Sequence, residues 1–175
     1  MNIRRVRQSD LSRIAEIFVF NNRINYFPIF KDAEYSFGEL QVVTFIEQYL
    51  KKEDVVSNIY VYEDGVVKGF LQMAGREIYK LYVDVCFQNE GIGHQLIEFA
   101  IKNFQANQLW ALEKNTKAIA FYQRHGFQMT GQKKFEEGTT EYIVELKRVK
   151  DCIKSLPESA ENSIIYLYDK HMFFK

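Results

Sequence analysis

The stretch that decides the fold runs from Leu81 to Gly93 and reads LYVDVCFQNEGIG. It begins as the end of an apolar strand, passes through a short loop and opens a helix whose apolar stripe starts at Ile92. Gly91 and Gly93 stand where loop and helix join, and glycine there lets the backbone approach a ligand closely. The free N–H groups of a first helical turn also attract phosphate. The stretch therefore predicts a pyrophosphate cradle.

Two common nucleotide-binding loops do not match this stretch. A dinucleotide fingerprint needs a third Gly or Ala where Leu96 stands, and a Walker loop needs Gly-Lys-Ser/Thr where Gly93, His94 and Gln95 stand. The missing lysine also argues against phosphoryl transfer, so a nucleotide-binding enzyme is disfavoured. A glycine turn that only starts a helix stays open as the plain structural interpretation.

The composition is that of a globular chain with a large core. Of 175 residues, 47% are hydrophobic and 26% are charged, which argues against disorder and coiled coil. The 23 Lys plus Arg balance 23 Asp plus Glu, so no net field attracts nucleic acid or an anionic membrane. Cys86 and Cys152 show neither disulfide-scaffold spacing nor a Cys-x-x-Cys motif, which favours a reduced compartment. We expect a soluble, cytoplasmic protein without nucleic-acid or membrane partners.

Strand and helix patterns alternate along most of the chain. Asp64-Gly65 joins two strands in a tight hairpin, and Asn21 to Gly38 forms an unusually aromatic connection. The order predicts an α+β (mixed α/β) fold, a central sheet flanked by helices. The expected elements cover residues 3–7, 11–18, 42–50, 59–63, 66–74, 77–85, 92–104, 109–112, 117–125, 128–135 and 139–146.

The chain divides into one domain and an addition. Residues 1–148 are expected to form the domain, and residues 149–175 an added C-terminal extension. The apolar run from Ile164 to Tyr168 needs burial, so the extension is expected to pack on the domain or on a partner in a homodimer.

A second motif, NTKAIAFYQRHGF, runs from Asn115 to Phe127. It joins an Asn at a helix start, a Tyr on that helix and a Gly-Phe exit. Together with Gln88-x-x-Gly91-x-Gly93, it resembles the cofactor-side motifs of the GNAT superfamily of acetyl-CoA-dependent N-acetyltransferases. The resemblance covers residues 1–148 and departs at Val85, where relatives often have proline.

The resemblance implies acetyl-CoA as co-substrate, bound in a V-shaped split between two central parallel strands, here residues 77–85 and 109–112. The strand backbone of Leu81, Tyr82 and Val83 would bind the pantetheine amides, and Asn115 would contact the pantetheine arm. The residues implied for the pyrophosphate cradle, mainly through main-chain N–H groups, are Gln88, Asn89, Glu90, Gly91, Ile92, Gly93 and His94.

The resemblance also implies direct transfer from the thioester to an acceptor amine. Tyr122 would protonate the departing thiolate, for which a phenol with a pKa of about 10 is suited. An amine with a pKa of about 10.4 is mostly protonated at pH 7, so a base is needed. Glu77, at the start of the strand that leads to the glycines, resembles the base of some members, and Glu113 is the reserve choice.

Plain structural interpretations stay open for these residues. Asn115 can be only a helix N-cap, Tyr122 a core residue and Glu77 an exposed strand-end acid. The alternative function is a catalytically silent acyl-CoA-binding module with a regulatory or interaction role. His94 and His125 lie apart without partners at metal-ligand spacing, so we expect no metal. The acceptor amine is not identified, although the resemblance places the segment from residue 21 to 37 in its floor.

Overall fold

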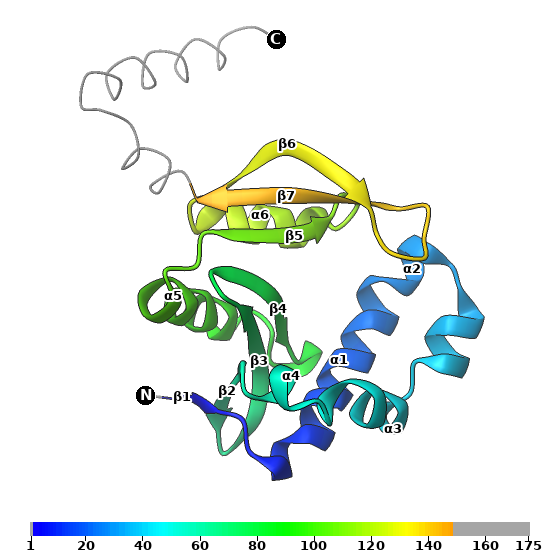
Figure 1. Cartoon of the computed structure of the whole chain (residues 1–175), viewed down its shortest axis with the longest axis vertical. Helices are drawn as coiled ribbons and strands as arrows, with labels where there is room; N and C mark the ends of the chain where they lie inside the picture. The colour runs from blue at the N-terminus through cyan, green and yellow to red at the C-terminus, as the bar shows by residue number, and fades with distance from the viewer. Residues whose placement is uncertain (1, 149–175) are drawn as a thin grey trace, which may run out of the picture.

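A seven-stranded mixed sheet with helices on both faces forms the described part of the chain (Figure 1). The computed structural model describes residues 2–148, so the expected C-terminal extension lies outside the described residues. The strands are β1 (Ile3–Arg5), β2 (Ile59–Asp64), β3 (Val66–Ala74), β4 (Glu77–Val83), β5 (Gln108–Leu112), β6 (Phe127–Phe135) and β7 (Tyr142–Arg148). They are ordered β1-β2-β3-β4-β5-β7-β6. This confirms the predicted fold class.

Six α-helices and four shorter helical turns connect the strands within residues 2–148. They are α1 (Leu11–Asn25), α2 (Phe27–Phe30), α3 (Val42–Phe45), α4 (Glu53–Val56), α5 (Ile92–Phe104) and α6 (Thr116–Arg124), with the helical turns η1 (Gln8–Asp10), η2 (Glu34–Glu39), η3 (Ile46–Leu50) and η4 (Val85–Phe87). Within residues 2–148, no helix has the length and apolar character that a membrane crossing requires.

The strands β4 and β5 are paired in parallel over only a short distance. Glu77 lies opposite Gln108 and Ile78 opposite Leu109, and no later pair joins these strands. All other neighbouring strands run antiparallel. The sheet therefore opens between β4 and β5 beyond Ile78, which agrees with the split that the family resemblance implies.

A bulge in β4 lies at the point where the split opens. Met73 of β3 lies opposite Ile78, but the preceding Gln72 lies opposite Lys80, so Tyr79 is an extra residue in β4. A bulge bends its strand and reverses the alternation of side chains beyond it. As a result, the side chains of Lys80 and Ile78 lie on opposite faces of the sheet.

Two apolar clusters occupy the two faces of the sheet. One gathers α5 and β5 to β7 around fully buried side chains such as Leu96, Leu109 and Phe127. The other joins α1, η3 and α4 to β2 and β3 around Ile14 and Leu50. The apolar stripes of α1 and α5 thus face the sheet, as an amphipathic helix requires.

The aromatic connection is more helical than the sequence predicts. Asn21 and Asn22 were expected to interrupt the first helix, but α1 continues to Asn25. Their side-chain amides donate to the carbonyls of Ile17 and Phe18, each 2.8 Å away. These bonds satisfy the polar side chains within the helix, and α2 and η2 follow it.

The closing hairpin begins its second strand later than expected. Thr139 lies in the turn, where its hydroxyl donates to the carbonyl of Glu136 over 3.0 Å and accepts from the Glu141 N–H over 3.1 Å. The strand β7 therefore starts at Tyr142 rather than at Thr139.

Candidate functional site

The separated part of β4 forms one wall of the split. Leu81, Tyr82 and Val83 lie beyond the bulge, where pairing with β5 has ended. The first and third of these pack against the α5 cluster, whereas Tyr82 packs against the α1 cluster. The amides of Asn21 and Gln88 donate to the Val83 carbonyl over 3.1 and 3.3 Å. The Gln88 side chain thus fastens the following loop to β4.

The loop after β4 is held by a carboxylate. Asp84 accepts a hydrogen bond of 2.8 Å from the Cys86 N–H and pairs with Arg13 of α1 across 2.6 Å. Asn89 takes a left-handed φ of +68°, which asparagine tolerates better than most residues. These contacts and this backbone conformation fix the path of the loop between β4 and α5.

The first turn of α5 has no side-chain cap among the described residues. Gly91 occupies the N-cap with φ +80°, a conformation that favours glycine. Ile92 is only 2% exposed and packs in the core, so it offers a ligand only its backbone. Asn89 and Glu90 are exposed beside it. The N–H groups of this turn therefore form the anion-attracting end that a pyrophosphate cradle needs.

Gly93 has a different reason to be glycine. A Cβ at this position would lie 3.3 Å from two ring atoms of Phe121 and 3.8 Å from a methyl group of Val83. The absence of a side chain lets α5 approach α6 closely. By contrast, a Cβ at Gly91 would meet no heavy atom within 4 Å.

The structure brings His94 and His125 together, although they are isolated from each other in the sequence. The ring nitrogens His94 Nδ1 and His125 Nε2 are 3.0 Å apart. His125 Nδ1 is 2.8 Å from the Phe121 carbonyl, to which it donates, and in the neutral imidazole this leaves Nε2 as the acceptor for His94 Nδ1–H. The pair ties the start of α5 to the end of α6. Residues 2–148 contain no group of three or more potential metal-ligating side chains.

Three tyrosines converge beside the split. Tyr26 follows α1, Tyr82 lies on β4 and Tyr122 lies on α6. The hydroxyl oxygens of Tyr82 and Tyr26 are 3.4 Å apart. Burial raises the pKa of all three phenols, most strongly those of Tyr82 and Tyr122, and the nearby Tyr26 adds to both shifts. The cluster therefore holds its protons throughout the neutral range.

Asn115 connects this cluster to α6. Its side-chain oxygen accepts from the Ala118 N–H over 3.2 Å, so the residue is the N-cap of α6. Its side chain also hydrogen-bonds Tyr26, which lowers the pKa of that phenol against the larger effect of burial. The structure thus shows Asn115 as a helix cap that also contacts the tyrosine cluster.

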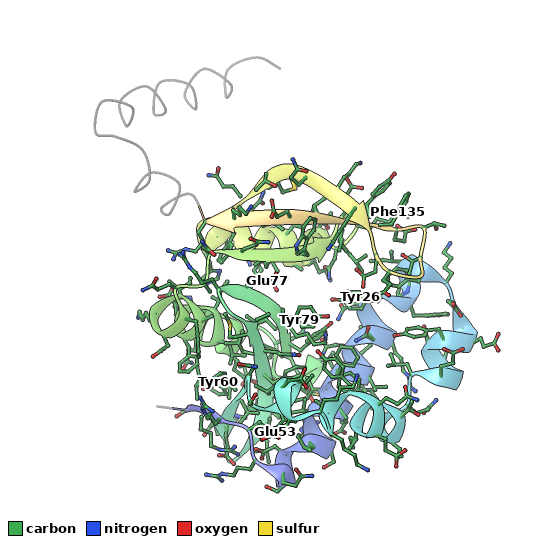
Figure 2. The ribbon with its side chains drawn as sticks, viewed as in Figure 1. Tyr26, Glu53, Tyr60, Glu77, Tyr79 and Phe135 are labelled. Carbon is green, nitrogen blue, oxygen red and sulfur yellow. The ribbon has the colours of Figure 1, made fainter. Side chains whose placement is uncertain are left out.

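Glu77 has different neighbours. Burial raises the pKa of its carboxyl, Lys134 opposes the shift and Glu145 adds to it. Lys134 lies on β6 and Glu145 lies on β7. Figure 2 shows Glu77 at the start of β4, where this strand pairs with β5, whereas Tyr26 lies at the end of α1. The reserve residue Glu113 is exposed and pairs with Lys133 across 3.5 Å.

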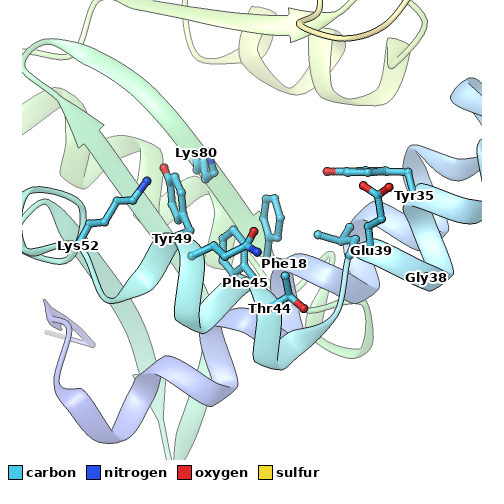
Figure 3. Close-up of a pocket in the computed structure, with 11 residues that line it drawn as sticks. Phe18, Tyr35, Gly38, Glu39, Thr44, Phe45, Tyr49, Lys52 and Lys80 are labelled. Carbon is cyan, nitrogen blue, oxygen red and sulfur yellow. The ribbon is translucent and has the colours of Figure 1, made fainter.

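A cleft of about 750 Å³ opens on the α1 side of β4 (Figure 3). Tyr35 is the only lining residue from the segment 21–37 that we expected to form the acceptor floor. Most of the lining comes instead from residues 38–52. The lining residues are Phe18, Tyr35, Gly38, Glu39, Leu40, Thr44, Phe45, Gln48, Tyr49, Lys52 and Lys80.

Lys80 and Glu136 are parts of this region that sequence reasoning missed. Burial lowers the pKa of Lys80 to about 8, and Glu136 opposes the shift through space. Glu136 also raises the pKa of Tyr26 and Tyr35, so its charge acts over the whole region. One signal was present: a lysine two residues after the buried Ile78 contradicts a regular strand and indicates the bulge.

Comparison with known sequences points to one family. Residues 56–129 match the family described as acetyltransferase (GNAT) domain. The chain is 30% identical over 69 residues to the peptidyl-lysine N-acetyltransferase YjaB of Salmonella typhimurium and 28% identical to that of Escherichia coli. These matches cover 39% of this chain, and they span about half the length of the curated relatives, 48% and 47%.

Solved structures share the fold over most of the described chain. Apo YjaB from Escherichia coli superposes with a TM-score of 0.66 at 22% identity, over 84% of this chain and 96% of that one. PaiA N-acetyltransferase from Thermoplasma acidophilum, solved in complex with coenzyme A, gives a TM-score of 0.59 at 18% identity, over 83% and 97% of the two chains. At these identities the likeness establishes the fold alone.

Proposed function

The chain belongs to the GNAT superfamily, and on that premise we propose that it transfers an acetyl group from acetyl-CoA to a primary amine. One observation carries the proposal: the open split between β4 and β5 ends at an uncapped helix N-terminus and is flanked by the half-buried Tyr122. A thioester can extend along the split while its phosphates reach the helix.

The described residues fit acetyl-CoA as co-substrate. The unpaired part of β4, from Leu81 to Val83, can bond to pantetheine amides as a further strand would. The main-chain N–H groups from Asn89 to His94 would hold the pyrophosphate, and Asn115 would contact the pantetheine arm. The coenzyme A complex of PaiA, a protein of the same fold, supports this choice of ligand.

Tyr122 supplies the proton donor in the proposed reaction. The neutral amine attacks the thioester carbonyl, a C–N bond forms and the C–S bond breaks. The Tyr122 phenol is protonated at neutral pH and can donate a hydrogen bond, and then its proton, to the departing sulfur. The burial that raises its pKa also makes this phenol a weaker acid. The sulfur leaves as a thiolate and gains its proton from this phenol or from solvent.

Glu77 is our proposed base for the acceptor ammonium. A carboxyl whose pKa is raised by burial holds a proton more firmly than an exposed one, which favours proton acceptance. The group lies at the closed end of the split, away from the tyrosines, so the proton would reach it through water.

Thermal unfolding with and without ligand tests the cofactor. Acetyl-CoA at about 100 times its Kd should raise Tm by roughly 5–10 °C, whereas NAD and ATP should not. A release assay for free CoA on an amine panel then separates an enzyme from a silent acyl-CoA-binding module. An equal shift with NAD, or none with acetyl-CoA, would sink the proposal.

Two finer expectations accompany the proposal. The cysteine pattern favours a cytoplasmic location. A homodimer stays a prediction because residues 149–175, which motivate it, lie outside the described part of the chain. Light scattering on the full chain and on a chain ending at Lys150 would decide whether the extension causes association.

A further inference from the structure

We propose that the cleft beneath β4 selects an acceptor amine that carries a carboxylate and an apolar or aromatic body, and that Lys80 binds the carboxylate. The inference rests on the proposed acetyltransferase function and names its substrate class. It is carried by the position of Lys80, the aromatic lining of the cleft and the distribution of charge along it.

Lys80 presents its ammonium to the cleft without an ion pair to any carboxylate in residues 2–148. Its Nζ lies 4.0 Å from the ring centroid of Tyr79, 4.7 Å from that of Tyr49 and 5.8 Å from that of Phe18. Ring faces attract a cation, but they replace only part of its lost hydration. An anionic ligand group would complete this environment.

The charge in the cleft is unevenly distributed. Figure 3 shows Lys52 extending toward Tyr49 and Lys80 at one end, with Glu39 beside Tyr35 at the other end. Glu136 acts on Lys80 only through space. The end of the cleft next to β4 is therefore cationic, which suits a carboxylate and repels an ammonium.

The floor between these ends is a continuous aromatic surface. Phe18 and Phe45 stack with ring centroids 4.1 Å apart, and Phe45 and Tyr49 stack at 5.0 Å. Such a surface accepts an apolar or planar body by burial and ring contact. A small hydrophobic ligand can thus lie on the floor with its charged end at Lys80.

The location of Lys80 relates the carboxylate to the reacting centre. The residue follows the bulge at Tyr79 and directly precedes Leu81, the start of the wall proposed to hold the pantetheine arm. In an α-amino acid, the amine and the carboxylate share one carbon. A carboxylate at Lys80 therefore keeps the amine near the mouth of the split.

The proposed substrate class differs from peptidyl-lysine, the substrate that the names of the YjaB relatives state. A lysine side chain within a peptide carries no carboxylate near its amine and would leave Lys80 without an anionic partner. The two classes can therefore be separated by substrates that differ only in a carboxylate.

The test compares matched amines in a CoA-release assay at pH 7. The pairs are phenylalanine with phenethylamine, tyrosine with tyramine and leucine with isoamylamine. We expect kcat/KM to be at least tenfold higher for the amino acid, about 1.4 kcal/mol. Lys80→Met should abolish this preference, Lys80→Arg should retain it, and the exposed control Lys51→Met should leave it unchanged.

The pH profile provides a second readout. With the pKa of Lys80 at about 8, the amino-acid preference should hold below pH 8 and decline as pH rises further, because the ammonium loses its charge. The Lys80→Arg variant should keep the preference to higher pH. Measuring its melting temperature also shows whether a side chain of similar length preserves the fold.

Several outcomes would overturn the inference. They are CoA release without a carboxylate preference, faster turnover of a lysine-containing peptide amide than of every amino acid, and acetylation of Lys80 itself in the intact-mass spectrum. Each of these leaves the acetyltransferase function standing. If no amine supports CoA release, the proposed function fails, and the inference fails with it.

Discussion

The loop from Asp84 to Gly93 and the cleft beneath β4 adjoin the same strand but are built from different parts of the chain. The loop is one short segment that offers main-chain N–H groups at the start of α5. The cleft gathers side chains from α1, from residues 35–52 and from β4. One site depends on backbone conformation, and the other on which side chains are present.

This contrast separates the two halves of the proposed reaction. The loop can hold the same cofactor with many side chains, provided that its backbone keeps its conformation. The cleft can change its acceptor through a single residue without altering the cofactor site. Changes near the loop and at Tyr122 should therefore affect every acceptor equally, whereas changes at Lys80 should affect acceptors selectively.

The largest expected effect is that of Tyr122→Phe. The variant removes the phenol proton but preserves the ring that contacts Phe121 and Phe127. General acid catalysis is worth about 10² to 10⁴ in rate, so we expect kcat to fall at least tenfold for all acceptors. Affinity for acetyl-CoA should stay within about twofold, as calorimetry would measure.

The comparison variant for this prediction is Tyr26→Phe, which removes a phenol from the same cluster, together with its hydrogen bond to Asn115, but leaves Tyr122 in place. A drop in kcat as large as that of Tyr122→Phe would indicate that the cluster acts as a unit. An unchanged kcat for Tyr122→Phe, with chemistry limiting turnover, would return Tyr122 to a purely structural role.

The next effect concerns the contact between α5 and α6. Gly93→Val would drive side-chain atoms into the Phe121 ring, which already lies 3.3 Å from the ideal Cβ position. Overpacking of this kind costs about 1–3 kcal/mol of unfolding free energy. Denaturant unfolding would measure it, and acetyl-CoA affinity should fall with it because the first turn of α5 shifts.

A double-mutant cycle identifies the cause. Phe121→Leu should reduce the cost of Gly93→Val, because the contact is shared. It should leave the cost of Gly91→Ala unchanged at about 1–2 kcal/mol, since that cost comes from φ +80° in open space. Additive effects at positions 93 and 121 would contradict the packing explanation.

The fold was largely predictable because its signals are local. The Asp64-Gly65 hairpin and the stripe beginning at Ile92 indicated β2, β3 and α5 directly, and the structure confirms them. The length of α1 was underestimated because asparagine usually interrupts helices. Asn21 is tolerated because it bonds to the carbonyls of Ile17 and Val83, a tertiary effect that periodicity does not reveal.

The same distinction between local and tertiary signals applies to the candidate site. The loop glycines and the cap at Asn115 could be found from sequence, because they depend on neighbours in the chain. Tyr26 could not, because its position depends on where α1 ends. Lys80 had only the indirect signal of a lysine two residues after Ile78, because the bulge at Tyr79 decides which face its side chain takes. The proximity of His94 to His125 likewise depends on how α5 packs against α6.

A smaller effect is expected from Glu77→Gln. The substitution keeps size but removes basicity, so the chemistry-limited rate at pH 7 should fall about tenfold and recover partly as rising pH deprotonates the free amine. In wild type, the raised pKa of Glu77 means that the rate falls at low pH as this carboxylate is protonated. Glu113→Gln is the matched comparison, and a loss there instead would transfer the role to Glu113.

The smallest effect separates the two roles of Asn115. Asn115→Ala removes the cap on Ala118 and should lower the unfolding free energy by about 1 kcal/mol, whereas Asn115→Ser should restore most of it because serine also caps helices. If Asn115 also contacts the pantetheine arm, the serine variant should still bind acetyl-CoA about fivefold more weakly, since one polar contact is worth about 1 kcal/mol. Calorimetry on both variants, together with their melting temperatures, makes the distinction. Wild-type affinity in a serine variant of normal stability would leave Asn115 as a helix cap alone.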